Sequence, residues 1–358
     1  MVDGAAPGQD VGPVSTVQIT RVDVHDDAAL AAWHDLVDRS ERHDHGDLMT
    51  IWTLPELTAE LRSGRRQVAS AAYVGTVDGA PVVWGMTMLP QLDNLGTADL
   101  GVAVPPEHRR RGHGSAMLRH LEAEVSGAGR SVLTAEVMWP VAASRDGVGQ
   151  AGVEFARRQG FTVGNVEVKR VLRCPVATQR LDELAASAAP HHAGYTLRSW
   201  TGPVPEDLLE SWAVLTSSLT SEAPSGDLHV EPEAADVEAV RENEQLLVAQ
   251  GRTAYRCVAM APDDTPVAYT ELVTTVHEPG RAYQWGTLVH GDHRGHRLGL
   301  ALKVATQRAV QEAGAVDPAG PVDHVLTWNA DSNAHMVAVN EALGFEPVEW
   351  CGMLQKRL

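Results

Sequence analysis

The sequence predicts two α/β domains that follow one another in the chain and share one plan. Two observations support this prediction. The same order of hydrophobic runs, turn residues and helical patterns occurs twice, and a chain of 358 residues with 44% hydrophobic residues is long enough to form two cores. Corresponding positions lie 184 to 186 residues apart, as in the pairs Asp78 and Asp264, Arg109 and Arg294, and Gly160 and Gly344. A spacing this constant indicates a duplicated domain.

Each half is predicted to begin with amphipathic helices and a β-hairpin. Apolar residues recur at helical spacing before the hairpin in both halves. In the first half, β-forming runs at 68–77 and 80–89 flank Asp78-Gly79, a pair that favours a tight hairpin turn. In the second half, similar runs at 255–261 and 266–275 surround Asp263-Asp264.

A third apolar run follows each hairpin, at 100–104 and at 285–289. It leads through a loop rich in Arg, His and Gly into a helix with an apolar stripe, and a further strand is predicted at 131–138 and at 324–328. Since each half ends soon after its Gly-Phe pair, we expect an N-terminal domain at 1–174 and a C-terminal domain at 195–358. The linker 175–194 carries Ala, Ser and Pro and can hold one short helix around Leu181 and Leu184.

Charge and hydropathy limit the partners that we expect. The formal net charge of −18 argues against nucleic acid or an anionic membrane, because both need basic surface to offset phosphate charge. No apolar run approaches the roughly 18 residues of a membrane span, and residues 1–15 lack the features of a signal peptide. Three widely spaced cysteines fit a reducing compartment without disulfides. We therefore expect a cytoplasmic protein, a monomer or homodimer, with a small-molecule partner.

The loop after the third strand of the first half is the most informative local motif. A strand leads into a basic turn with two glycines, and the turn opens a helix. Helix N-termini present free N–H groups and a positive dipole end, so this turn is suited to an anion such as pyrophosphate. It is neither a Walker motif nor a dinucleotide-binding motif. The candidate binding residues are Arg109, Arg110, Arg111, Gly112, His113, Gly114 and Ser115.

The order of strand, Arg-x-x-Gly-x-Gly and helix resembles the coenzyme A pyrophosphate loop of the GNAT superfamily of N-acetyltransferases. The resemblance implies that each domain is a mixed, mostly antiparallel twisted sheet flanked by helices, and that acetyl-CoA is the co-substrate. It also implies polarising backbone N–H groups on the preceding strand, near Val102 or Val104 in the first half and near Leu288 or Val289 in the second. The tandem form is similar to the architecture of mycothiol synthases.

The second half carries a corresponding loop with one departure. Arg297 stands where the first half has Gly112, and we expect it to donate its N–H from a helical conformation. The candidate coenzyme-binding residues of this loop are Arg294, Gly295, His296, Arg297, Leu298, Gly299, Leu300 and Ala301. His290, His293 and His296 are spaced three apart, but a metal there would compete with the phosphates for the same turn, so no metal is expected.

Three asparagines of the second half are further candidates by the resemblance. Asn329, Asn333 and Asn340 are expected to face coenzyme A or the reaction centre, although capping by Asn333 and a surface position for Asn340 are open alternatives. In many GNAT members the position of Asn340 is a Tyr that protonates the departing thiolate, and an amide cannot act as that acid. Asn340 and Asn329 are therefore candidates for polar contacts to the reacting groups.

The candidate general base is Glu271, on a hairpin strand expected to border the acceptor cleft, and a base that acts through a water is an equal alternative. In the first half, Asp99 begins the strand before the loop, where the resemblance implies an acidic base. A solvated carboxylate is the alternative for each. In the first half, residues 142–152 replace the Asn-bearing helix entry, so the second half is predicted to be catalytic. The expected reaction is acetylation of the primary amine of a small polar molecule such as an amino-sugar, antibiotic or metabolite. Mycothiol synthase-like acetylation of a cysteinyl pseudodisaccharide and a non-catalytic coenzyme A sensor are the alternatives.

Overall fold

The computed structural model describes residues 17–358, and its elements follow the predicted order in both halves. The strands of the first half are β1 (Gln18–Arg21), β2 (Val68–Val77), β3 (Ala80–Pro90), β4 (Thr97–Ala103), β5 (Val132–Pro140) and β6 (Thr162–Arg173). Those of the second half are β7 (Thr196–Thr201), β8 (Arg252–Met260), β9 (Pro266–Thr275), β10 (Arg281–Val289), β11 (His324–Ala330) and β12 (Glu346–Arg357).

Helices connect these strands. The first half contains α1 (Asp27–His45), α2 (Leu54–Arg62), α3 (His113–Gly127) and α4 (Ala151–Arg158), and α5 (Thr178–Ala188) lies between the halves. The second half contains α6 (Leu209–Ser217), α7 (Leu219–Glu222), α8 (Val237–Ala249), α9 (Leu298–Ala313) and α10 (Ala334–Leu343). Short 3-10 turns are η1 (Gly46–Leu48), η2 (Pro106–His108), η3 (Ala189–His191), η4 (Glu206–Leu208) and η5 (Gly291–His293).

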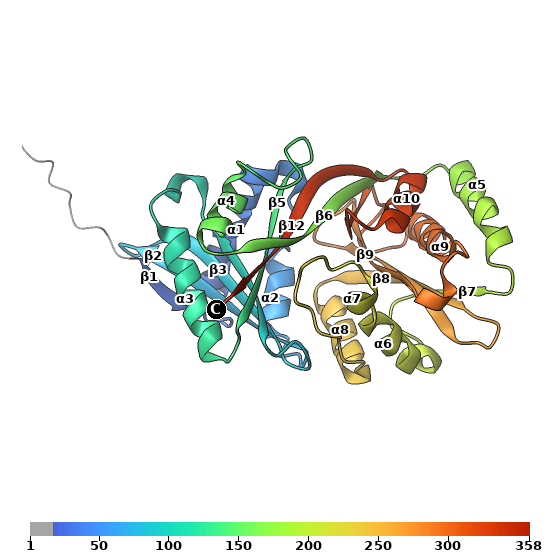
Figure 1. The fold of residues 1–358 in the computed structure, drawn as a ribbon, viewed down its shortest axis with the longest axis horizontal. Coiled ribbons are helices and arrows are strands. Elements are labelled where there is room, and N and C mark those ends of the chain that lie inside the picture. The colour runs from blue at the N-terminus through green and yellow to red at the C-terminus, as the bar shows by residue number, and fades with distance from the viewer. Residues whose placement is uncertain (1–16) are drawn as a thin grey trace, which may run out of the picture.

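The described strands form one mixed, mostly antiparallel sheet that runs through both halves (Figure 1). Its order is β1-β2-β3-β4-β5-β12-β6-β11-β10-β9-β8-β7. The last strand of each half crosses into the other half, so that β12 pairs with β5 and β6, while β6 pairs with β11 and β12. This exchange joins the two sheets through backbone hydrogen bonds and leaves no free edge between them.

The predicted fold class is confirmed, and its hairpins lie at the expected positions. Asp78 and Gly79 both have positive φ, 51° and 80°, which matches the twist of the flanking strands β2 and β3. In the second hairpin, Asp264 also has positive φ (62°) between β8 and β9. Aspartate tolerates this region better than most residues, which is why it can stand in both turns.

Helices cover the two faces of the sheet. We call the faces the α1 face, covered by α1, α2, α6 and α8, and the α3 face, covered by α3, α5, α9 and α10. On the α1 face, Trp33 and Leu57 pack on Trp84 in the first half, and Trp212 packs on Tyr269 in the second. Each half therefore has a core on both sides of its strands, as expected for a sheet with helices on two faces.

A fork opens in the sheet in each half. The parallel strands β4 and β5 pair only over Thr97–Asp99, and β10 and β11 pair only over Arg281–Gln284. Beyond these residues the strands diverge, and in the second half an irregularity between Gln284 and Thr287 interrupts the pairing of β10 with β9. A bulge turns the strand away from its partner, so each fork places backbone groups of two strands at the rim of an opening.

The linker helix α5 belongs to the core of the second half. Leu181, Leu184 and Ala188 are buried in one cluster with Leu300 and Ala301 of α9. Ion pairing of Asp182 with Arg308 and hydrogen bonds of Gln311 with Val176 fix the helix along α9. The predicted helix around Leu181 and Leu184 is thus present, and it covers part of the helix that follows the second loop.

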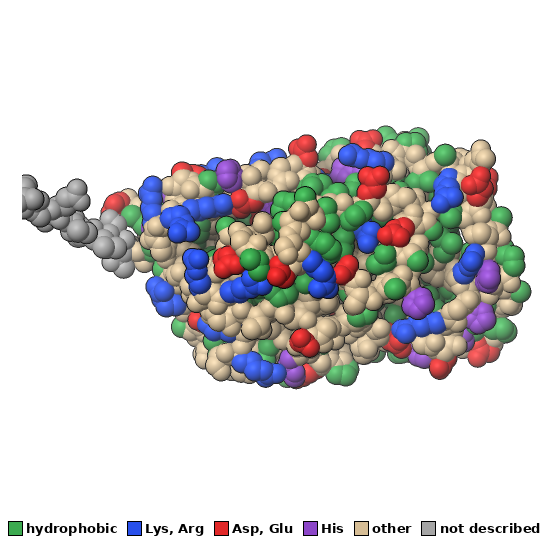
Figure 2. Space-filling view, turned by 45° about the horizontal axis from the view of Figure 1, so that its top comes forward, with side chains coloured by type: hydrophobic (Ala, Val, Ile, Leu, Met, Phe, Trp, Pro, Cys, Tyr) green, Lys and Arg blue, Asp and Glu red, His purple; other side chains and the backbone are tan. Residues whose placement is uncertain are grey.

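Acidic and basic side chains are interspersed over the face of the molecule shown in Figure 2. On that face the acidic side chains are not gathered into a single area. None of the helices between residues 17 and 358 has the length and apolar character needed to cross a bilayer.

Candidate active site

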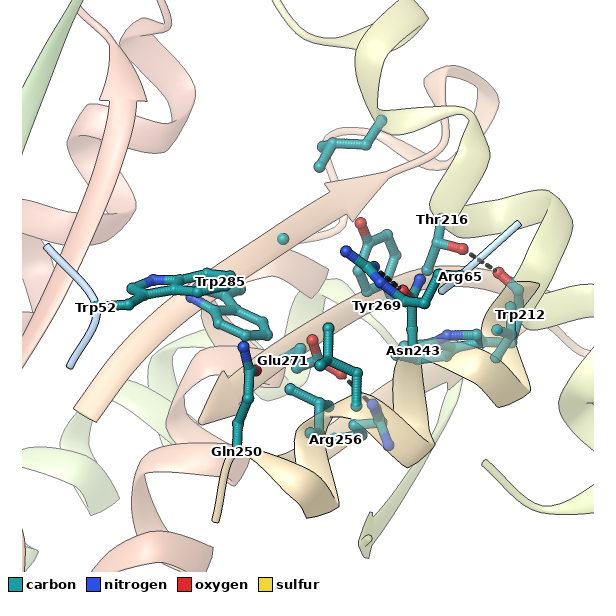
Figure 3. Close-up of a pocket in the computed structure, with 15 residues that line it drawn as sticks. Trp52, Arg65, Trp212, Thr216, Asn243, Gln250, Arg256, Tyr269, Glu271 and Trp285 are labelled. Carbon is teal, nitrogen blue, oxygen red and sulfur yellow. Dashed lines mark hydrogen bonds and ion pairs between the residues drawn. The ribbon is translucent and has the colours of Figure 1, made fainter. Parts of the chain in front are cut away.

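A cavity of about 350 Å³ lies on the α1 face of the second half, at the bulge of β10 (Figure 3). Its walls come from both halves of the chain. The lining residues are Trp52, Arg65, Trp212, Thr216, Leu219, Val240, Asn243, Leu246, Leu247, Gln250, Arg256, Tyr269, Glu271, Trp285 and Gly286. A volume of this size suits a small molecule, and the walls combine aromatic rings with polar and charged side chains that can orient a ligand.

The first half contributes Trp52 and Arg65 to this cavity. Arg65 Nη2 bonds both carboxylate oxygens of Glu60, at 2.7 and 2.8 Å, and Nη1 bonds Asn243 of α8. Trp52 lies beside Trp285 at the other end of the cavity, as Figure 3 shows. The wall is therefore assembled only when the two halves pack together.

Glu271 is the carboxylate of the cavity. Its side chain is 13% exposed and forms an ion pair with Arg256 of the neighbouring strand β8. Arg256 also lies 3.7 Å from Glu244 and donates to the carbonyl of Gly202 at 2.5 Å, so its orientation is fixed. The ion pair with Arg256 therefore fixes the direction of the Glu271 side chain at the cavity wall.

Tyr269 lies on the same face of β9 as Glu271, because residues two apart in a strand point the same way. Its hydroxyl lies so close to Gly286, in the bulge of β10, that a Cβ at that position would collide with it. Burial raises the pKa of Tyr269 well above its usual range, so the phenol keeps its proton. Sequence reasoning missed this residue, although the spacing Tyr269-Thr-Glu271 places both side chains on one face.

In the first half, indole rings fill the corresponding space. Trp84, which matches Tyr269, stacks on Trp33 with ring centroids 5.3 Å apart and lies against Gly101, which matches Gly286. Trp33 Nε1 donates to the carbonyl of Gly85 at 3.1 Å, which locks the stack in place. The second half therefore has a cavity beside its fork, whereas the first half has packed indole rings at the matching place.

The first loop has the backbone geometry of an anion site. Arg110 and Gly112 have positive φ, 63° and 85°, and α3 starts at His113. Within residues 17–358 no protein group accepts a hydrogen bond from the N–H groups of His113, Gly114 or Ser115. Arg110 and Arg111 are exposed beside these donors, so charge and free N–H groups converge on one turn.

Arg109 has a different role from the one predicted. Its Nε donates to the carbonyl of Val104 at 2.8 Å, and its two Nη atoms bond the carboxylate of Asp44 at 2.8 and 2.7 Å. A third contact goes to Ser40 at 3.0 Å. Because these donors are used within the protein, Arg109 ties the loop to β4 and α1 and is not available to an anion in this arrangement.

The second loop has the same backbone conformation as the first, but glycine and arginine have changed places at its two left-handed positions. Gly295 and Arg297 have positive φ, 85° and 52°, at the positions that match Arg110 and Gly112. The expectation that Arg297 is helical is therefore wrong, since it is the left-handed N-cap of α9. The N–H groups are still presented as in the first loop, because the same two positions turn the chain.

The basic side chains of the second loop are occupied by protein partners. Arg294 bonds Glu222 at 2.6 Å and lies 3.4 Å from the carbonyl of Val289, which mirrors Arg109 in the first loop. Arg297 donates to the carbonyl of Ser187 at 3.0 Å, and His296 bonds that of His191 at 2.9 Å. Any anion bound here would be held mainly by backbone N–H groups.

Four predicted coenzyme residues of the second half have buried side chains. Leu298 packs with Leu302, and Leu300 and Ala301 pack against α5. Leu288 is 5% exposed in the core beneath α6. Their side chains are core residues, which corrects the prediction for the side chains, and only their backbone groups can face a ligand.

The other predicted residues of the strands and loops remain accessible. Val102 and Val104 are half-buried along the first fork, and Val289 is half-buried at the end of β10. Gly299 is buried, and a Cβ there would meet only Val289 Cγ2, at 3.8 Å. Gly114 and Ser115 are half-buried at the matching place of the first half.

The asparagines do not all face the fork, in contrast to the prediction. Asn333 caps α10, accepting a hydrogen bond from the Met336 N–H at 3.1 Å. Asn340 is fully buried and donates to Asn329 Oδ1 at 2.9 Å, while Lys303 Nζ donates to Asn340 Oδ1 at 2.7 Å. Asn340 therefore contacts protein groups on all sides and cannot contact a substrate directly in this arrangement.

Lys303 was not identified from the sequence. It is 2% exposed, and burial lowers the pKa of its amine to about 7. The signal that could have found it is a Lys on the apolar stripe of a helix, at the position where the first half has Leu118.

Three carboxylates gather on the α1 face beside the first fork. Thr134 donates a hydrogen bond to Asp99, and burial raises the pKa of Asp99, Glu136 and Glu167, the last to about 7. The predicted base Asp99 thus lies at the fork, where the pairing of β4 with β5 ends, and desolvation raises its pKa.

The loop histidines take part in local contacts. His293 Nδ1 bonds the hydroxyl of Tyr195 at 3.0 Å, and His290 lies 4.0 Å from Glu222. In the part of the chain that the structure describes, no three His, Cys, Asp or Glu side chains are grouped as a metal site would require.

Comparisons with known proteins identify a domain in the first half and a similar tandem architecture. Residues 30–161 match the Acetyltransferase (GNAT) family. No curated protein gives a significant match. Among solved structures, a tandem GNAT protein from the clavulanic acid biosynthesis pathway is similar over 96% of this chain and 98% of its own, with 27% identity and a TM-score of 0.75.

Two further structures share the fold at lower identity. A GCN5-related N-acetyltransferase from Sphaerobacter thermophilus is 12% identical, with 95% of each chain covered and a TM-score of 0.63. A fungal GCN5-related glucosamine N-acetyltransferase region of a multi-domain β-N-acetylglucosaminidase is 12% identical, with 99% of this chain and 39% of that one covered and a TM-score of 0.62. The chain is thus an acyltransferase that contains a GNAT acetyltransferase domain and has the tandem GNAT architecture.

Proposed function

We propose that the protein transfers the acetyl group of acetyl-CoA to the primary amine of a small polar molecule, and that transfer takes place in the second half. The observation that carries this proposal is the cavity at the β10 bulge, which brings Glu271 and Tyr269 together beside the second fork. In the first half the matching space is filled by Trp33 and Trp84, which supports coenzyme binding there without transfer.

Two coenzyme loops support the choice of co-substrate. Free N–H groups at the start of α3 and α9, preceded by paired left-handed residues, are suited to a pyrophosphate. The fork beside each loop offers unpaired strand backbone to the extended arm of such a molecule. When bound, acetyl-CoA would supply an activated thioester carbonyl for attack by the amine.

Glu271 is proposed as the proton acceptor for the incoming amine. An amine is nucleophilic only after it loses a proton from its ammonium form, and a carboxylate within the cavity can receive that proton. The ion pair with Arg256 keeps the side chain in place between turnovers. A solvated carboxylate elsewhere on the strand would have no such fixed direction.

Tyr269 is proposed as the proton donor to the departing thiolate. In this chain Asn340 stands where many GNAT members have the tyrosine that acts as this acid. An amide cannot donate a proton to a thiolate, so another residue is needed. The Tyr269 hydroxyl lies at the bulge, two residues before Glu271, and the raised pKa of the phenol keeps it protonated. Acid and base therefore come from one strand, and their separation is set by the strand geometry.

The acceptor class follows from the cavity walls. Asn243, Gln250 and Arg65 offer hydrogen bonds. Gln250 Oε1 and Arg65 Nε are buried, and neither has a hydrogen-bond partner among residues 17–358. Trp52, Trp212 and Trp285 provide flat apolar surfaces. This combination suits an amine with several polar groups and a ring, such as an amino-sugar, more than an extended peptide.

The experiment that tests the proposal combines binding and turnover. Acetyl-CoA is titrated calorimetrically into the wild type, Gly114→Glu and Gly299→Glu, and each protein is assayed for acetyl transfer to a panel of primary amines that includes D-glucosamine, an aminoglycoside and a free amino acid. A glutamate at either glycine places a carboxylate at the start of the coenzyme helix, where it would repel phosphate.

We expect two binding sites in the wild type and one in each variant, with transfer abolished only in Gly299→Glu. Transfer that survives Gly299→Glu but is lost in Gly114→Glu would move the reaction to the first half. Binding without transfer to any amine would favour the coenzyme sensor.

A further inference from the structure

A buried chain of hydrogen bonds connects Lys303, Asn340 and Asn329 behind the second fork. Lys303 Nζ donates to Asn340 Oδ1 at 2.7 Å, and Asn340 Nδ2 donates to Asn329 Oδ1 at 2.9 Å. The three side chains come from α9, α10 and β11. Asn329 lies two residues beyond Thr327, the last residue of β11 that pairs with β10, so the chain of hydrogen bonds ends at the rim of the fork.

The first half packs the same place with apolar side chains. Leu118 on α3 and Ala156 on α4 are buried in one cluster with Phe161. Their counterparts are Lys303, Asn340 and Phe345, and Lys303 Nζ lies 5.5 Å from the centroid of the Phe345 ring. The two halves therefore share the aromatic ring and the helix packing, and differ in the two polar residues.

Lys303 and Asn340 should stabilise the fold less than the apolar pair Leu118 and Ala156 does at the matching place. A lysine amine that is 2% exposed has lost its hydration, and one hydrogen bond to an amide does not restore it. The lowered pKa of the Lys303 amine, about 7, has burial as its cause. The same chain shows that leucine and alanine fit this place, so packing alone does not require the polar pair.

We propose that Lys303 is a positioning residue of the second half: it fixes Asn340, and through it Asn329, against the arm of acetyl-CoA at the fork. This inference rests on the proposed function, because it assigns a role within the proposed transfer site. Asn329 donates its own amide N–H to the Ala330 carbonyl at 2.9 Å, so its side chain and the adjacent backbone are held as one unit. Fixing that unit fixes the β11 side of the fork.

The test uses Lys303→Met, which keeps the length of the side chain and removes its amine. The matched control is Leu118→Met at the same place of the first half. Both are made in the Gly114→Glu background, where only the second loop is left to bind acetyl-CoA. Calorimetric affinity for acetyl-CoA, kcat and KM for the amine, and the thermal unfolding midpoint are measured for each.

We expect Lys303→Met to weaken acetyl-CoA binding about tenfold and to lower kcat, with an unchanged KM for the amine and an unfolding midpoint at least as high as that of its parent. Leu118→Met should leave affinity and kcat unchanged. Equal affinity and kcat in Lys303→Met and its parent would overturn the proposal. A drop in the unfolding midpoint that accounts for the lost binding would overturn it as well.

A second variant tests the proposal in case Lys303→Met does not fold. The double substitution Lys303→Leu with Asn340→Ala reproduces the packing of the first half and should fold, yet show the same loss of affinity. The affinity measurement does not depend on turnover, so failure of the proposed function, seen as no transfer by the wild type, is distinguishable from failure of this inference.

Discussion

Glu56 of α2 and Arg252 of β8 form an ion pair in which both side chains are fully buried between the two halves, with Oε1 and Nε 2.9 Å apart. Glu56 also accepts from Thr53 at the start of α2 and from Thr275 of β9. The Arg252 guanidinium lies 4.5 Å from the ring centroid of Trp52, a wall of the cavity. One carboxylate therefore couples the cap of a first-half helix to the strands that carry the site.

Glu56→Gln should destabilise the protein by about 3–5 kcal/mol, because Arg252 would be left buried with no charge partner. The measurement is chemical denaturation at pH 7. Glu238→Gln is the control, since the pair of Glu238 with Arg66 is exposed, and it should leave the stability nearly unchanged. Equal effects of the two changes would contradict a structural role for the buried pair.

The same carboxylate should make stability fall at acidic pH. Burial alone would raise the pKa of Glu56, but the charge of Arg252 and hydrogen bonds from Thr53 and Thr275 lower it below its usual 4.5. A lowered pKa stabilises the fold fully above the unfolded value and loses that contribution as pH drops through the folded value. The unfolding free energy of the wild type should thus decline below pH 4.5. In Glu56→Gln the decline should be smaller, and parallel curves would contradict this assignment.

Lys303→Met should raise the unfolding free energy at pH 7 by about 1–4 kcal/mol, because it removes a buried amine. The folded pKa is about 7 against 10.5 unperturbed, so the unfolded chain binds the proton more readily between these values. The free-energy cost of burying the charged Lys303 amine is therefore fully present below pH 7, and it disappears as pH rises toward 10.5. Denaturation curves at pH 7 and pH 10 should show the advantage of the variant shrinking, and a constant advantage would argue against a buried titrating amine.

Tyr269→Phe should lower kcat at least about tenfold with little effect on stability, because only the hydroxyl beside Gly286 is removed. The control is Tyr73→Phe, whose ring belongs to the first half. Steady-state kinetics on the best amine of the panel give the comparison. An unchanged kcat in Tyr269→Phe would exclude the phenol as the proton donor, and water would then deliver the proton to the thiolate.

Arg65→Met should raise the KM for the amine about tenfold and leave acetyl-CoA affinity unchanged, since Arg65 reaches the cavity from the first half. Arg66→Met is the matched control, because Arg66 pairs with Glu238 and Glu242 at the surface. If both variants kept the wild-type KM, the cavity would not be the acceptor site.

Much of the fold was predictable because the signals are local. The Asp78-Gly79 turn, the strand runs and the glycine loops depend on residues that are neighbours in the chain, and a duplicated pattern is visible without any structure. The exchange of β6 and β12 was not predictable, because strand pairing between halves depends on contacts more than 100 residues apart, to which a hydrophobic pattern alone assigns no partner.

The candidate site divides in the same way. The positions of the loops at Gly112 and Arg297 follow from residue type and spacing, although the left-handed conformation of Arg297 was not predicted. The role of Glu271 stays a prediction. The role of Arg109 was predicted incorrectly, because whether a guanidinium meets phosphate or Asp44 depends on where α1 packs. Asn340 was likewise placed at the ligand, whereas its depth beside Lys303 depends on how α9 and α10 meet.

The sequence by itself determined that the chain holds two copies of one α/β plan, each with a glycine- and arginine-bearing loop at a helix start. Those features are set by local backbone preferences and repeat along the chain. Only the tertiary structure decided that the halves share one sheet, that Trp52 and Arg65 complete a cavity in the other half, and that Tyr269 faces Glu271's cavity at the bulge. These depend on the burial of side chains distant in sequence, whose partners are chosen by packing across the whole molecule.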